Sequence, residues 1–301
     1  MSGELTSETD SGPGRTGPTG RVPVEGDRRT APRRPPGEDL SAPVAQEVYQ
    51  RFLRVLCAGD VEFLVGGAYA FTRYTGIERS TKDFDVFVRS TEIDRALDVL
   101  TQAGFRTEMS FPHWLAKAYS GDTFVDVIFN SGNGETPIDD DWFTNAPRAE
   151  VLGMPVKLMP VEEMLWSKSF IMERERYDGA DVVHLIRSGA ATLDWDRILW
   201  RFGDRWRVLL FNLVLFGFVY PNERTRLPRA LMDELLARLR TELDTPAPGK
   251  VCNGTLVSRQ QYLIDVNEWE YDDGRLVPRG GMTREQIAQW TAAIAPGSGE
   301  K

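Results

Sequence analysis

Residues 83–88 constrain the fold most, because acidic and apolar side chains alternate along them in the order Asp-Phe-Asp-Val-Phe-Val. Successive side chains of a β-strand point to opposite faces of the sheet, so this stretch places Asp83 and Asp85 side by side while Phe84 and Val86 enter the core. Two like charges on one face of a buried strand repel each other, and a bound divalent cation would neutralise both. The stretch therefore predicts a strand that carries a cation-binding pair of carboxylates.

A second apolar stretch, residues 123–129, has a single carboxylate at its centre, Asp126. A carboxylate in an apolar strand is costly to bury unless it is paired or bound to a metal. If this strand lies beside the strand of Asp83 and Asp85, three carboxylates converge, which is the ligand set of a two-metal phosphoryl-transfer site. The chain has only two histidines, so oxygen ligands are expected, and these favour Mg²⁺, with Mn²⁺ also possible.

The Gly66-Gly67 pair stops a short apolar strand and opens a helix. Glycine permits close approach of the backbone, and a helix N-terminus offers N–H groups to an anion. The pair therefore predicts a binding place for the β and γ phosphates of a nucleotide. Ser80, Thr81 and Lys82, which directly precede the aspartates, are candidates for a further phosphate contact.

In this order, the motifs resemble the DNA polymerase β-like nucleotidyltransferase superfamily. Residues 63–70 (Phe-Leu-Val-Gly-Gly-Ala-Tyr-Ala) and 79–85 (Arg-Ser-Thr-Lys-Asp-Phe-Asp) are similar to its bacterial branch, which includes aminoglycoside nucleotidyltransferases and AbiEii-type toxins. The resemblance covers roughly residues 60–185. It implies an α/β (α+β) fold, with a nucleotidyltransferase-like mixed sheet flanked by helices and followed by a helical C-terminal half.

The resemblance also implies roles for the acidic residues. In the family, the first two aspartates bind both metals and the third helps to activate the acceptor hydroxyl, which assigns Asp83, Asp85 and Asp126 as catalytic and metal-binding residues. The glycines would cradle the triphosphate. One departure is that the stretch from Gly67 to Asp83 is longer than in the shortest family members, so a full helix must fit there.

Three residues of the helical half have similar positions to family residues near the nucleotide. Lys168 would meet the triphosphate, although a solvated helix residue is the alternative interpretation. Asp178 and Asp181 begin the next helix, and they are weaker candidates for the site. The alternative for Asp178 is a helix N-cap, and the alternative for Asp181 is a surface residue or an ion-pair partner of Arg174 or Arg176.

The implied activity is an Mg²⁺-dependent transfer of a nucleoside monophosphate, from a nucleoside triphosphate such as ATP to an acceptor hydroxyl, with release of pyrophosphate. A toxin-type enzyme would modify tRNA or a protein and would have an antitoxin partner. The alternatives are an aminoglycoside-type enzyme that modifies a small molecule, and a non-catalytic nucleotide-binding protein on the same fold. The net charge of -9 argues against broad, non-specific binding of nucleic acid.

Composition along the chain predicts four segments. Residues 1–43 are poor in aliphatic side chains and are expected to be a disordered tail. Residues 44–158 form the expected catalytic domain and 159–245 the helical domain. Residues 246–301 are an extension of uncertain structure, in which 256–266 is expected to add a strand or a pair of strands.

The length of the apolar runs and the number of cysteines indicate the cellular compartment in which the protein is expected. The longest apolar run, Val208 to Tyr220, is shorter than the roughly 18 residues of a membrane span. An apolar secretory segment is not visible at the N-terminus. Two cysteines do not make a disulfide framework, so a cytoplasmic protein without membrane contact is expected.

Overall fold

The computed structural model describes residues 43–79, 83–246 and 249–293. All of them belong to one compact unit, Glu38–Lys301, whereas the other unit, Met1–Gly37, contains none of the described residues. The predicted tail, except for its last residue, and the candidate phosphate contacts Ser80, Thr81 and Lys82 therefore lie outside the described residues.

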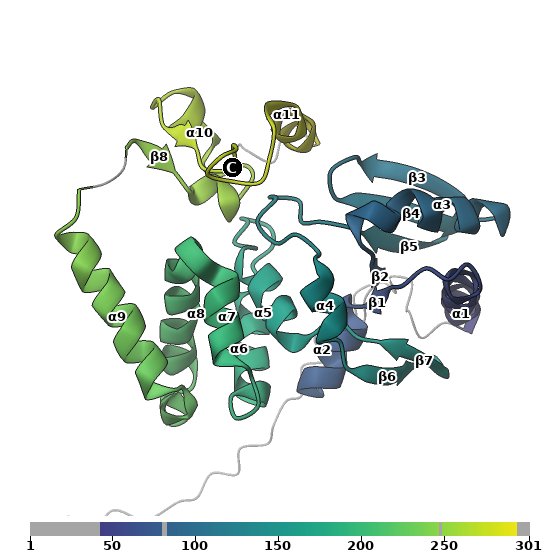
Figure 1. Cartoon of the computed structure of the whole chain (residues 1–301), viewed down its shortest axis with the longest axis horizontal. Coiled ribbons are helices and arrows are strands. Elements are labelled where there is room, and N and C mark those ends of the chain that lie inside the picture. Colours follow the sequence, from purple (N-terminus) through teal and green to yellow (C-terminus); the bar gives the residue numbers. More distant parts are fainter. Residues whose placement is uncertain (1–42, 80–82, 247–248, 294–301) are drawn as a thin grey trace, which may run out of the picture. The chain divides into compact units, whose positions relative to one another are not determined.

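A five-stranded sheet with the order β1-β2-β5-β4-β3 carries the site (Figure 1). Strands β2 and β5 run parallel, and the other neighbouring pairs run antiparallel, so the sheet is mixed as predicted. The strands are β1 (Leu64–Val65), β2 (Phe84–Phe87), β3 (Arg106–Phe111), β4 (Leu115–Ser120) and β5 (Thr123–Ile128).

Three helices accompany the sheet, namely α1 (Pro43–Ala58), α2 (Gly67–Thr75) and α3 (Ile93–Gln102). Helix α1 turns an apolar face inward, and its Tyr49 ring stacks on Phe84 of β2 with 4.7 Å between ring centroids. Phe84 and Val86 are fully buried, which confirms the alternation predicted for this strand. The apolar face of β2 thereby fixes the opposite face, with its carboxylates, away from α1.

The helical half begins after a small hairpin and is tied directly to the sheet. The main-chain N–H of Met159 donates to the carbonyl of Val65 at 2.9 Å, and Val65 also pairs with Leu158. One hydrophobic core includes residues from α1 through α9, while the domain boundary near residue 158 stays a prediction. The elements are β6 (Arg148–Val151), β7 (Met154–Lys157), α4 (Asp140–Thr144), α5 (Val161–Ser169), α6 (Gly179–Gly189), α7 (Trp195–Phe202), α8 (Trp206–Val219) and α9 (Arg229–Leu243).

The C-terminal extension differs from its prediction. The expected strand over 256–266 is wrong, because local turns take up the backbone hydrogen bonds there: Ser258 N–H donates to the Gly254 carbonyl at 3.0 Å. The extension instead holds a parallel pair of two-residue strands and two helices. These are β8 (Val251–Cys252), β9 (Asp272–Asp273), α10 (Leu263–Asn267) and α11 (Arg284–Ala292).

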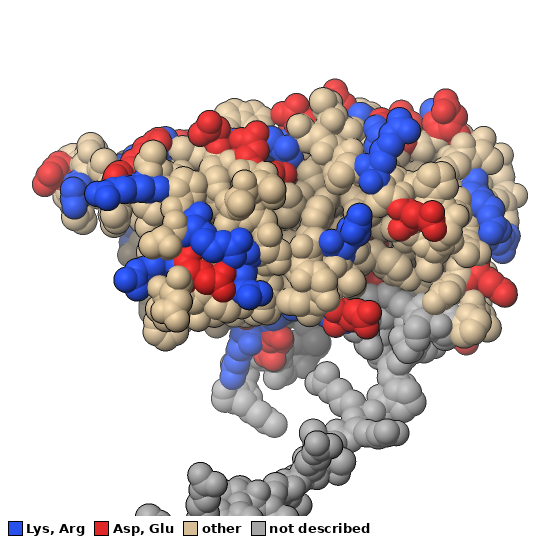
Figure 2. Space-filling model, turned by 90° about the horizontal axis from the view of Figure 1, so that it is seen from below, with Lys and Arg blue, Asp and Glu red and all other residues tan. Residues whose placement is uncertain are grey.

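Surface character agrees with the composition. Within the described residues, no helix is both long enough and apolar enough to span a membrane. On the face shown in Figure 2, lysine and arginine side chains lie interspersed with aspartate and glutamate.

Candidate active site

Asp85 and Asp126 lie directly opposite each other on the neighbouring parallel strands β2 and β5. The expectation that the two acid-bearing strands are adjacent is thus confirmed. Asp83 immediately precedes β2, and its charge acts on both of the other carboxylates. Three carboxylates therefore face the same space at the β2–β5 centre of the sheet.

The electrostatics of this group are unfavourable for the bare protein. Burial, together with the charges of Asp126 and Asp83, raises the pKa of Asp85 to about 7, against the lowering effect of Lys168 and Arg176. Burial also raises the pKa of Asp126. A cation at this position would relieve the repulsion that the protein's own positive side chains only partly offset.

Lys117 is a site residue that sequence reasoning missed. It lies opposite Asp126 on β4, and its Nζ donates to Asp126 Oδ1 at 2.5 Å. Its ammonium also lies 4.1 Å from the centroid of the Phe124 ring. The signal was available, because a two-residue turn at Gly121 and Asp122 sets the β4–β5 register that pairs this lysine with Asp126.

The glycine turn, Gly66-Gly67, packs closely against Asp85. A Cβ on Gly67 would lie 1.8 Å from Asp85 Oδ2, and one on Gly66 would lie 2.2 Å from Cε2 of Phe87. Gly67 has φ +52°, a conformation that favours glycine, and Gly66 N–H donates to the Asp85 carbonyl at 3.0 Å. A side chain at Gly67 would therefore collide with the carboxylate, one at Gly66 would require the Phe87 ring to move, and α2 starts directly beside Asp85.

On the helical half, Lys168 in the last turn of α5 is not a solvated residue. Its Nζ lies 2.8 Å from Asp178 Oδ2 and 2.8 Å from Asp181 Oδ2. Asp181 is only 5% exposed and also pairs with Arg79 at 2.5 Å, so the surface alternative for it is wrong. Asp178 occupies the N-cap position of α6 without a side-chain capping bond.

Arg176 completes the cluster and was not a predicted site residue. Its Nη2 lies 3.0 Å from Asp178 Oδ2, while most of its side chain is exposed. The charges of Lys168 and Arg176 both lower the pKa of Asp85. These two cations are therefore close enough to act on Asp85, and Asp178, directly before α6, pairs with both of them.

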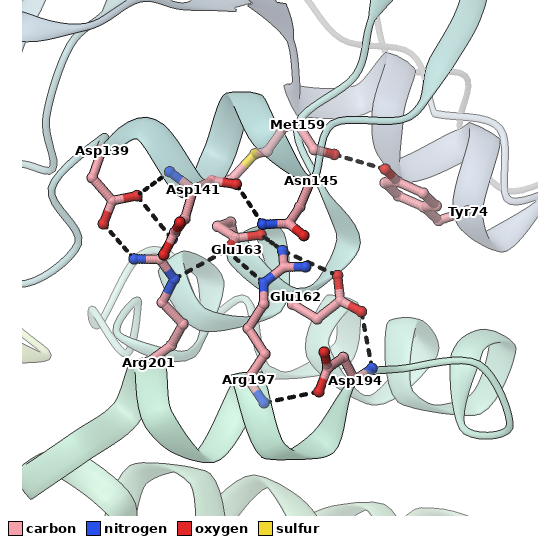
Figure 3. Close-up of polar contacts among 10 residues, drawn as sticks. All are labelled: Tyr74, Asp139, Asp141, Asn145, Met159, Glu162, Glu163, Asp194, Arg197 and Arg201. Carbon is pink, nitrogen blue, oxygen red and sulfur yellow. Dashed lines mark hydrogen bonds and ion pairs between the residues drawn. The ribbon is translucent and has the colours of Figure 1, made fainter.

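A buried ion-pair network fixes the start of α5 (Figure 3). The Glu163 side chain is fully buried and accepts hydrogen bonds from Arg197 and Arg201 of α7. Arg201 also donates to Asp139, the N-cap of α4, at 2.5 Å. The network locks α4, α5 and α7 together, and it thereby sets where the opposite end of α5 presents Lys168.

The carboxylates are not gathered into a ready metal cage. Among residues 43–79, 83–246 and 249–293, no group of three or more His, Cys, Asp or Glu side chains is arranged to hold a metal ion. Lys117 already engages one oxygen of Asp126. Mg²⁺ suits such a place, because it usually keeps several waters and binds one or two carboxylates together with substrate phosphates.

Family comparison agrees with this geometry. The model of a family described as nucleotidyl transferase of unknown function (DUF2204) matches residues 45–202, more than half of the chain. The chain belongs to this nucleotidyl transferase family. The matched part of the nucleotidyl transferase holds the glycine turn, the three sheet carboxylates and the Lys168 cluster. No curated protein matches the chain.

Solved structures of nucleotidyltransferases are similar to the chain at low identity. The antibiotic-resistance factor ANT(2'')-Ia is 16% identical with a TM-score of 0.41, over 56% of this chain and 96% of that one. A nucleotidyltransferase-like antigen from Paracoccidioides brasiliensis is 16% identical with a TM-score of 0.38, over 60% and 90%. The lincosamide adenylyltransferase LnuA, bound to lincomycin, is 14% identical with a TM-score of 0.34, over 46% and 94%.

Proposed function

We propose that this nucleotidyl transferase moves a nucleoside monophosphate from a nucleoside triphosphate to an acceptor hydroxyl and releases pyrophosphate, with Mg²⁺ bound by Asp83 and Asp85. The observation that carries the proposal is the direct pairing of Asp85 with Asp126 across β2 and β5. Folding alone does not favour like charges in that position, whereas a divalent cation does. Once bound, Mg²⁺ would neutralise charge on the transferring phosphoryl group.

The triphosphate would be held from the helical half and from the glycine turn. Lys168 and Arg176 stand across from Asp85, and both are paired with Asp178. Phosphate oxygens would join Asp178 as acceptors for these two cations, so that the charge of the buried carboxylate stays compensated when the nucleotide binds. Because Gly67 has no side chain, the start of α2 lies close to Asp85, and its N–H groups would donate to phosphates held beside that carboxylate.

Asp126 is suited to the acceptor hydroxyl. One of its oxygens is held by Lys117, so the other remains to accept the hydroxyl proton or to serve as a third metal ligand. A general base must lie within hydrogen-bonding reach of the proton it removes and must stay ionised. The ammonium of Lys117 supports that state, because it lowers the pKa of Asp126 against the effect of burial.

The acceptor defines the biological role. A tRNA or protein acceptor would make the chain a toxin-type enzyme with an antitoxin partner, and an aminoglycoside would make it a resistance-type enzyme. Expression of the chain alone separates these roles, because the first impairs growth and the second protects cells from the drug. ATP is the first nucleotide to test, followed by the other three.

The test is pyrophosphate release in Mg²⁺ with each nucleotide and with total tRNA, whole-cell protein and an aminoglycoside panel. We expect release with one acceptor class, which disappears in EDTA and in the Asp83→Asn/Asp85→Asn variant. Equal release by wild type and this variant would refute the proposal. Tight nucleotide binding without turnover on any acceptor would instead favour a non-catalytic nucleotide-binding protein.

A further inference from the structure

The connection between α5 and α6, residues 171–178, forms a small hairpin beside the candidate site. Asp178 N–H donates to the Ile171 carbonyl at 3.0 Å, and Met172 pairs with Tyr177. The hairpin carries Arg176, whose guanidinium reaches Asp178 at 3.0 Å. Because most of the Arg176 side chain is exposed, its direction depends on how the hairpin itself is held.

The C-terminal extension holds the outer strand of this hairpin. Met172 N–H donates to the Val257 carbonyl at 3.0 Å. Both carboxylate oxygens of Glu173 are used, since Ser258 Oγ donates to Oε2 at 2.7 Å and Arg259 N–H donates to Oε1 at 3.1 Å. Ser258 is buried, while the Glu173 side chain is about one quarter exposed, so the bond to Ser258 is the better shielded of the two.

The same segment of the extension is also bonded to the loop that follows strand β5. Asn133, in the loop that follows β5, donates from Nδ2 to the Leu256 carbonyl at 2.6 Å, and both residues are buried. Residues 256–259 therefore bridge the loop after the Asp126 strand and the hairpin that carries Arg176. This bridge lies beyond residues 45–202, the part that matches the family.

We propose that residues 256–259 act as a clamp on the active site, and that Glu173 is the positioning residue through which the clamp sets Arg176 against the triphosphate. The inference rests on the proposed function, because it gives Arg176 a phosphate to bind. It assigns a role to the extension, whose residues 256–259 support the hairpin beside the nucleotide site. Glu173 itself is not expected to touch the nucleotide.

A double-mutant cycle on nucleotide affinity tests this. Binding of a non-hydrolysable ATP analogue in Mg²⁺ is measured by calorimetry for wild type, Glu173→Ala, Arg176→Ala and the double variant. We expect Glu173→Ala to weaken binding about tenfold in the wild-type background, and to change it little once Arg176 is gone, because a positioning residue acts only through the group that it positions. Ser258→Ala, which keeps the Glu173 charge, is expected to show part of the same effect.

The matched control is Glu175→Ala, on the same hairpin, whose exposed carboxylate lies 3.9 Å from Arg174. It should leave binding unchanged. Equal losses from Glu173→Ala in the presence and absence of Arg176 would overturn the clamp proposal, and so would an unchanged affinity in both Glu173→Ala and Ser258→Ala. A wild-type protein that fails to bind any of the four nucleotides in Mg²⁺ would instead refute the proposed function.

Discussion

Asp85 and Asp126 face each other across two parallel strands, and a glycine that cannot carry a side chain lies against the first of them. Such an arrangement costs stability in the absence of a cation, because the like charges repel each other, and gains stability in the presence of one.

Replacing Asp85 by asparagine should stabilise the metal-free protein at pH 8. Burial, Asp126 and Asp83 raise the pKa of Asp85 to about 7, so its contribution to stability is full below the ordinary value of 3.8 and is lost as the pH rises through 7. We expect the free energy of unfolding to rise by about 1–3 kcal/mol at pH 8, and to change less at pH 5. Urea titrations in EDTA at pH 8 and pH 5 measure this free energy of unfolding. If the substitution had the same effect at both pH values, the pKa of Asp85 would not be raised by burial and neighbouring charge.

Gly67→Ala should abolish activity for a steric reason that its control lacks. A Cβ there would lie 1.8 Å from Asp85 Oδ2, whereas Gly76, at the other end of α2, has a similar positive φ with no atom within 4 Å. Gly76→Ala should cost only the conformational strain, about 1 kcal/mol, with kcat/KM kept. Gly67→Ala should reduce kcat/KM by roughly 100-fold or more. Similar activity in the two variants would show that contact with Asp85 is unimportant.

Lys117→Met should slow turnover and shift its pH dependence. Without the ammonium, the pKa of Asp126 rises further above its usual value, so the acidic limb of the kcat profile should move to higher pH, with kcat at pH 7 down about tenfold or more. Lys117→Arg should restore part of the rate. Lys157→Met serves as the control, because it removes the ion pair of Lys157, on β7, with Glu62. If Lys117→Met shifted the pH profile no more than this control does, Asp126 would not be the base.

Glu163→Ala should destabilise the fold. Its fully buried carboxylate compensates Arg197 and Arg201 (Figure 3), and removing one partner of a buried pair typically costs about 3–5 kcal/mol. Glu234→Ala, which removes an exposed pair with Arg238, should cost less than about 0.5 kcal/mol. Chemical denaturation compares them, and a small effect at Glu163 would mean that water reaches the network.

Those features of the site that depend on local sequence patterns were predicted, whereas contacts between residues far apart in the sequence were missed. Alternation along β2 and the apolar flanks of Asp126 are local patterns, and they indicated both strands correctly. Lys168 was assigned to the triphosphate from a resemblance, but its pairing with Asp178 and Asp181 depends on how α5 and α6 pack. Packing of that kind leaves no periodic signal in the sequence.

The conformation of the C-terminal extension was harder still to predict from the sequence. Residues 256–266 contain apolar pairs that suit a strand, yet Ser258 and Arg259 bond to Glu173, which is 85 and 86 residues away. Hydrogen bonds to a distant carboxylate decide the local conformation there, and no short-range pattern reports them. For the same reason, the sequence does not distinguish Arg176 from the neighbouring arginine of the same charged loop.

Electron paramagnetic resonance of Mn²⁺ tests the central claim most directly, because it observes the metal without needing the acceptor. Since the described residues form no preformed cage, we expect tight Mn²⁺ binding only when protein and a non-hydrolysable nucleotide are both present. In the Asp83→Asn/Asp85→Asn variant, the signal should fall to that of Mn²⁺ and nucleotide alone. Identical Mn²⁺ spectra and affinities for wild type and this variant would show that Asp83 and Asp85 do not bind the metal.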